Sequence, residues 1–141
     1  IVSAEFEKNK GTLPWPVTRG VITGRFGKQA HESIPGITIE NNGVDIATEE
    51  GASVRSIFDG SVTSVFAIPG AGKNVIITHG AYKSVYTNLS NTEVKKGDSV
   101  VAGQVIGSVL TANGKTTAHL EIWKMAGTGP QPQNPEVWIR K

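Results

Sequence analysis

The sequence contains no cysteine. This absence excludes disulfide bonds, thiolate zinc sites and a catalytic thiol, so any metal ion would have to bind through His, Asp or Glu. Histidine is also scarce, with three residues in a chain of 141. Each histidine therefore has to be weighed as a candidate metal ligand or catalytic base.

Long apolar segments and a strong charge imbalance are absent as well. The sequence has no run of about 18 apolar residues and no basic start followed by an apolar core, so neither a membrane span nor a signal peptide is predicted. Fourteen basic and twelve acidic residues give a net charge of +2, which does not favour nucleic-acid binding. Because the chain starts at Ile1 and not at Met, we expect a processed protein or an excised fragment.

Glycine is abundant, at 17 of 141 residues, and it separates short groups of Val and Ile. Such groups, bounded by Gly, Asn, Asp or Pro, are typical of β-strands joined by turns. No window sustains the apolar spacing of an amphipathic helix. The expected strands include residues 21–22, 37–39, 44–46, 54–58, 62–68, 75–78, 84–89, 100–101, 105–110 and 119–123.

These patterns predict one all-β domain over residues 14–141. Residues 1–13 are polar and mixed in charge, and we expect them to form a tail or the end of an upstream helix. Trp15 stands between two prolines that favour an extended backbone. It is therefore expected to hold the entering chain against the core.

One sequence pattern occurs twice. Gly51-Ala52-Ser53-Val54 is followed by Gly60-Ser61-Val62, and Gly97-Asp98-Ser99-Val100 is followed by Gly103-Gln104-Val105. Each copy is typical of a turn, a strand, a second turn and a return strand. We therefore predict two related β-units that face each other.

The three histidines lie in different sequence contexts. His31 is in a polar connection, where a solvated loop side chain is expected. His79 ends an apolar run before a glycine, and it is expected to form local hydrogen bonds or to line a cleft. His119 begins an alternating segment in which Glu121 and Trp123 share its strand face. That face is either part of a groove or a half-exposed polar surface.

Asp45 is a further candidate because it stands between two apolar residues on a short expected strand. A carboxylate in such a position needs a partner or a binding site. The preceding segment, Asn41-Asn42-Gly43, is typical of a tight turn.

An ordered series of short sequence blocks extends over most of the chain. The blocks are GRFG at 24–27, NGVDIA at 42–47, GASV at 51–54, DGSV at 59–62, VIITHG at 75–80, YTNL at 86–89, VKKGDSV at 94–100, GQVIG at 103–107, HLEIW at 119–123 and NPEVW at 134–138. In these blocks the chain resembles the LytM or lysostaphin-type zinc metallopeptidases from about residue 14 to residue 141. The resemblance implies two antiparallel sheets that frame a groove and are built on a duplicated motif.

Active members of that family carry His-x-x-x-Asp, Tyr-x-His-Leu and His-x-His motifs. In this chain the two zinc-ligand positions of the first motif fall on Asn41 and Asp45. The catalytic histidine of the second motif falls on Asn88. In the third motif the catalytic position falls on Thr117 and the zinc position on His119. Compared with active members, this chain thus retains two zinc-ligand residues and has other residues in place of three essential histidines.

These replacements bear directly on the chemistry. A catalytic zinc usually has three protein ligands, and an Asn amide is a poor substitute for an imidazole. Neither Asn88 nor Thr117 has a pKa near neutrality, so neither can act as a general base. We therefore expect no catalytic residue and no cofactor. A zinc metalloendopeptidase that cleaves peptidoglycan crosslinks with an unorthodox third ligand, such as His79, is the alternative.

The loss of these histidines is similar to that in degenerate LytM domains of the EnvC and NlpD type, and in particular in EnvC-like proteins of Bacteroidetes. This resemblance implies an exported, periplasmic domain that binds and activates a peptidoglycan amidase during cell-wall remodelling and cell division. A peptidoglycan-binding module without a protein partner is a further alternative. The residues expected to line the groove are Asn41, Asp45, Tyr86, Asn88, Thr117, His119, Glu121 and Trp123.

Overall fold

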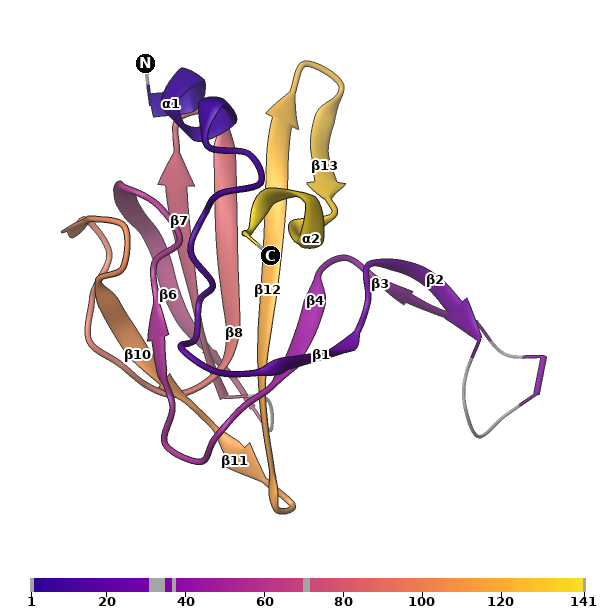
Figure 1. Ribbon diagram of the computed structural model, residues 1–141. Coiled ribbons are helices and arrows are strands. Elements are labelled where there is room, and N and C mark those ends of the chain that lie inside the picture. The colour runs from indigo at the N-terminus through magenta and orange to yellow at the C-terminus, as the bar shows by residue number, and fades with distance from the viewer. Residues whose placement is uncertain (1, 31–34, 37, 70–71, 141) are drawn as a thin grey trace.

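The computed structural model describes residues 2–30, 35–36, 38–69 and 72–140 (Figure 1). Most of this part is antiparallel β-structure, as the sequence predicts, and its two helices, α1 (Val2–Lys8) and α2 (Pro135–Trp138), are short. Neither is long and apolar enough to cross a membrane. The strands are β1 (Val21–Gly24), β2 (Gly27–Ala30), β3 (Thr38–Asn41), β4 (Val44–Ala47), β5 (Ser53–Arg55), β6 (Gly60–Ile68), β7 (Gly72–His79), β8 (Tyr82–Thr92), β9 (Ser99–Val100), β10 (Val105–Val109), β11 (Thr111–Ala112), β12 (Lys115–Ala126) and β13 (Gly129–Gln133).

One large sheet forms the body of the molecule. Its strands run in the order β1-β4-β12-β8-β7-β6-β9, and β13 adds to the free part of β12. β10 is hydrogen-bonded both to the end of β8 and to β5, so it joins a second layer to this sheet. β2 and β3 form a separate two-stranded sheet that extends away from the body (Figure 1).

The duplicated sequence pattern corresponds to two reciprocal strand pairs. β5, from the first copy, pairs with β10 of the second copy, and Arg55 lies opposite Val105. β6, also from the first copy, pairs with β9 of the second copy, and Gly60 lies opposite Val100. The first strand of each copy thus pairs with the second strand of the other. This arrangement confirms the prediction of two β-units that face each other.

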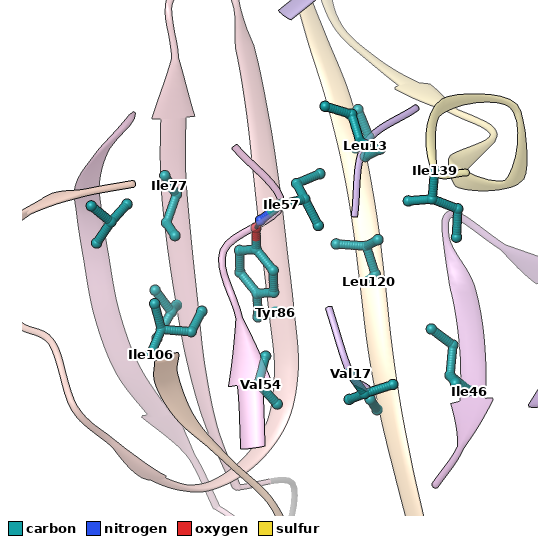
Figure 2. Packing of buried hydrophobic residues seen from close by; sticks show 14 of the residues in the cluster. Leu13, Val17, Ile46, Val54, Ile57, Ile77, Tyr86, Ile106, Leu120 and Ile139 are labelled. Atoms are coloured by element: carbon teal, nitrogen blue, oxygen red, sulfur yellow. Dashed lines mark hydrogen bonds between the residues drawn. The ribbon is translucent and has the colours of Figure 1, made fainter. Parts of the chain in front are cut away.

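The core lies against one face of the large sheet. Along β12 the buried residues Leu120 and Ile122 alternate with His119 and Glu121, which are partly exposed. Figure 2 shows Leu120 in the buried cluster with Ile46 of β4 and with residues of the second layer. Because successive side chains of a strand point to opposite faces, the burial of Leu120 directs the side chain of His119 to the other face of the sheet.

Both ends of the described chain pack against this core. Phe6 of α1 is fully buried and stacks on His79 and Tyr82, with ring centroids 5.0 and 4.9 Å apart. The indole N–H of Trp15 donates to the main-chain oxygen of Arg140 at 2.6 Å, and Trp15 packs on the core as expected. Residues 1–13 therefore include a short helix, and the predicted domain boundary at residue 14 stays a prediction.

Candidate functional site

The register of three strands places His119 at the centre of the site. His119 lies on β12, opposite Asp45 of β4 on one side and Thr87 of β8 on the other. Directly opposite residues of antiparallel strands project from the same face of the sheet. The imidazole Nδ1 of His119 lies 2.7 Å from Oδ1 of Asp45. Asp45 thus has the partner that its apolar sequence context predicts.

The other edge of the imidazole ring faces a second carboxylate. Nε2 of His119 lies 2.8 Å from Oε2 of Glu121, and the indole N–H of Trp123 donates to Oε1 of Glu121 at 2.7 Å. The three residues alternate along β12, so their shared face, predicted from the sequence, is confirmed.

Asn41 continues these contacts beyond Asp45. The backbone N–H of Gly43 donates to Oδ1 of Asn41 at 3.0 Å, which is the tight turn expected from the sequence. This bond fixes the orientation of the amide, so Nδ2 of Asn41 points to Oδ2 of Asp45 at 3.2 Å. We call the hydrogen-bonded series Asn41, Asp45, His119, Glu121 and Trp123 the polar chain.

The polar chain sets the protonation of its central residue. Burial lowers the pKa of His119, but hydrogen bonds and charge interactions with Asp45 and Glu121 outweigh burial and raise the pKa to about 9. With this pKa we expect both ring nitrogens to carry protons and to donate at neutral pH. The pKa of Glu121 is lowered, chiefly by its hydrogen bond with His119. The side chain of His119 is only 16% exposed, so solvent screens these charges weakly.

Two glycines make room for the carboxylates. A Cβ atom at Gly24 of β1 would clash with the carboxylate of Asp45. A Cβ atom at Gly43 would clash with the main-chain oxygen of Leu120 and would lie 2.7 Å from Cγ of Glu121. Both positions therefore require glycine for the polar chain to form.

Asn88 of β8, the residue after Thr87, lies beside Thr117 of β12. Asn88 follows an irregularity in the register of β8 and has a φ of 66°, a left-handed conformation that Asn tolerates better than most residues. Its Nδ2 donates to the main-chain oxygen of Thr117 at 3.3 Å. Neither side chain is a proton acceptor with a pKa near neutrality, so neither can act as a general base.

The prediction that Tyr86 lines the groove is wrong. Tyr86 is 1% exposed and projects into the core, where its hydroxyl accepts from the backbone N–H of Ile57 at 3.0 Å (Figure 2). It is in phase with Ser84 of the same strand, which is also buried. The neighbouring residue, Thr87, lies opposite His119, on the face of the sheet that carries the polar chain, and was not expected from the sequence.

His79 lies in the core, away from the polar chain. Its ring nitrogens lie 2.8 Å from the main-chain oxygen of Asp59 and 2.8 Å from the hydroxyl of Ser84. The pKa of His79 is lowered, chiefly by burial. The local hydrogen bonds expected for His79 are thus confirmed. His31 lies outside the described residues.

The donor atoms of the polar chain do not match a zinc site. Asp45 and Glu121 contact opposite edges of the His119 ring, so a metal ion on one ring nitrogen is out of reach of one carboxylate. The amide of Asn41 presents an N–H to this site and not a lone pair. Within the described residues no group of three or more His, Asp or Glu side chains has a geometry that could hold a metal ion.

Comparison with known families assigns this fold. Residues 39–135, which include Asn41, Asp45, Asn88, Thr117 and His119, match the model of peptidase family M23. The chain belongs to peptidase family M23. The LytM-type resemblance seen in the sequence blocks is thereby confirmed.

Several M23 proteins are similar to the chain over most of its length. Peptidoglycan DD-endopeptidase ShyB of Vibrio cholerae is 37% identical over 105 residues, which are 72% of this chain and 24% of ShyB. Cell division protein DipM of Caulobacter vibrioides is 31% identical over 80% of this chain and 18% of DipM. The crystal structure of Csd3 from Helicobacter pylori superposes with a TM-score of 0.77 at 29% identity, over 94% of this chain and 36% of Csd3.

The chain spans less than a third of the length of the curated relatives that it matches. These proteins therefore contain large additional regions. What the chain has in common with them is the M23 domain.

Proposed function

We propose that this chain is a non-catalytic M23 domain that binds and activates a peptidoglycan amidase in the cell envelope, in the manner of EnvC-like proteins. The observation that carries the proposal is the closed polar chain. Both ring nitrogens of His119 face carboxylates, Asp45 at 2.7 Å and Glu121 at 2.8 Å, and the raised pKa favours the protonated imidazole. A protonated imidazole has no lone pair for a metal ion and cannot accept a proton from water.

The side chains of Asn88 and Thr117 support the same proposal. Hydrolysis of an amide needs a base and a group that stabilises the developing oxyanion. Asn88 and Thr117 stand at the positions of the catalytic histidines of active M23 members, and their side chains supply no such base. The M23 fold around them is nevertheless present, and Gly24 and Gly43 leave room for the carboxylates. An M23 fold that lacks the catalytic histidines favours a binding function over hydrolysis.

The exposed parts of the polar chain offer a surface that suits a protein partner. Trp123 is partly exposed, and its indole is fixed by the hydrogen bond to Glu121. Fixed aromatic side chains are common at the energetic centres of protein interfaces. A relative named as a cell division protein, DipM, has 31% identity with this chain, which is consistent with a division-associated envelope function.

The proposed function is tested by a peptidoglycan digestion assay. Purified domain is mixed with dye-labelled sacculi, with or without each peptidoglycan amidase encoded in the same genome. We expect an increase in dye release only when domain and cognate amidase are both present. Trp123→Ala should abolish the increase, while Phe66→Ala, which removes a 42% exposed aromatic side chain of β6, should not. No increase with any of the amidases would refute the activator function.

A zinc metalloendopeptidase is the second candidate, because ShyB is named as a DD-endopeptidase and is 37% identical. Under this alternative, Asp45 and His119 bind zinc together with a third ligand. Equilibrium dialysis against zinc distinguishes the two candidates. We expect no stoichiometric zinc in the wild-type domain, and a gain of at least about 100-fold in zinc affinity in Asn41→His, which supplies a third ligand. Asn42→His, at the exposed neighbouring position, is the control.

A peptidoglycan-binding module without a protein partner makes a different prediction. Such a domain sediments with purified sacculi in the absence of any amidase. An activator that acts through the amidase sediments only when the amidase is added.

A further inference from the structure

A basic cavity of about 470 Å³ lies beneath the segment that leads into β1. Trp15 and Arg19 of this segment line it, together with Arg55 at the end of β5 and Arg140 near the end of the described chain. None of the described residues that line the cavity is acidic. The cavity shares no residue with the polar chain, so it is a separate feature of the molecule.

Arg55 is the key residue of this cavity. Its backbone N–H donates to the main-chain oxygen of Pro16 at 2.7 Å, which holds the covering segment over the strand. The side-chain Nε of Arg55 is buried and has no hydrogen-bond partner. A buried charged donor without an acceptor is unfavourable, so such a group calls for a specific explanation. Arg55 also lines the cavity, so an anionic ligand there would lie close to its charge.

The other two arginines add to the positive potential of the cavity. Arg19 forms an ion pair with Glu49 at 3.6 Å, but both side chains are more than two-thirds exposed, so the pair leaves much of the charge available. The main chain of Arg140 is fixed by the hydrogen bond from Trp15, and Arg140 also lines the cavity. Three arginines therefore line one cavity.

We propose that this cavity binds a small oxyanion, the carboxylate or phosphate group of a soluble ligand. The planar guanidinium of arginine matches the two oxygens of such a group in a bidentate contact. The volume lies within the range of small-molecule sites, and the ring of Trp15 supplies an apolar wall for the rest of the ligand. The inference is independent of the proposed amidase activation, since it rests on residues outside the polar chain.

The test is a titration followed by ¹H–¹⁵N NMR, in which the Arg55 Nε–H and Trp15 indole N–H signals report on the cavity. The probes are inorganic phosphate and N-acetyl-D-alanyl-D-alanine, which carries a free carboxylate, with sodium chloride as the ionic-strength control. We expect saturable shifts of both signals with at least one oxyanion and none with chloride. The probe that binds more tightly identifies the source of the oxyanion, phosphate or carboxylate.

Arginine variants test whether these side chains bind the oxyanion. Arg55→Gln should weaken the affinity at least about tenfold, and Arg140→Gln about threefold, because each removes a charge-assisted hydrogen bond. Lys96→Gln removes an equal charge from an exposed turn outside the cavity and should change the affinity less than twofold. If Arg55→Gln fails to fold, Arg140→Gln decides the question. Absence of saturable shifts, or equal weakening by Lys96→Gln, would overturn the proposal.

Discussion

The protonation of His119 gives the sharpest prediction of the structure. Its pKa is raised from the ordinary value of 6.5 to about 9, because the carboxylates of Asp45 and Glu121 outweigh the effect of burial. A raised pKa in the folded state means that the folded protein binds the proton more tightly than the unfolded chain does. The stabilisation is complete below pH 6.5 and is lost as the pH rises from 6.5 to about 9. The difference in the pKa of His119 between the unfolded and folded states corresponds to about 3 kcal/mol of unfolding free energy.

The perturbation that tests this reasoning is Glu121→Gln, which removes one carboxylate and retains a hydrogen-bond acceptor. We expect the pKa of His119 to fall by at least about one pH unit. The measurement is an NMR titration of ¹³C-labelled histidine, in which His119→Gln identifies the His119 signal by its disappearance. Glu49→Gln is the matched control, since Glu49 is exposed and forms only a surface ion pair with Arg19.

Urea unfolding at pH 6, 7.5 and 9.5 provides the thermodynamic counterpart. The stability difference between wild type and His119→Gln should shrink by about 3 kcal/mol over this range, while contributions from other groups cancel in the comparison. His79 does not contribute to the change above pH 6.5. Burial lowers the pKa of His79, so its titration affects stability only below that pH. A His119 midpoint at or below pH 6.5, with a constant stability difference, would refute the reasoning.

Three further predictions concern the scaffold. Gly24→Ala should destabilise the domain by at least about 2 kcal/mol through the clash with Asp45, whereas Gly127→Ala, which meets open space, should be within about 0.5 kcal/mol of wild type in chemical unfolding. Tyr86→Phe should lower the unfolding free energy by about 1–3 kcal/mol, because it leaves the buried backbone N–H of Ile57 unpaired, but it should leave partner binding unchanged. Phe6→Ala should cost about 3–5 kcal/mol if α1 is part of the cooperative unit, and an unchanged thermal midpoint would show that it is not.

Much of the site could be predicted from the sequence because strand alternation is a strong rule. The spacing of His119, Glu121 and Trp123 was sufficient to place the three side chains on one face. The apolar neighbours of Asp45 were sufficient to predict a partner. The duplicated Gly-x-Ser-Val pattern likewise predicted two facing units, since each copy has the length of one strand, one turn and one return strand.

Other features depend on contacts that the local sequence does not encode. Tyr86 was assigned to the groove from its place in a motif, whereas its phase with Ser84 and Tyr82 directs it to the core. β13 contains two prolines and has no strand pattern, and it forms because prolines are tolerated on an edge strand beside β12. The helix α1 is too short to be recognised by periodicity, and its burial depends on the aromatic contacts of Phe6.

The central proposal, that this M23 domain is non-catalytic, is tested most directly by incubating the purified domain alone with peptidoglycan and zinc. Crosslinked and uncrosslinked muropeptides are then quantified by mass spectrometry. The account predicts that the ratio of the two stays at the value of the enzyme-free control. Conversion of crosslinked to uncrosslinked muropeptides that is sensitive to chelators and abolished by His119→Ala would contradict it.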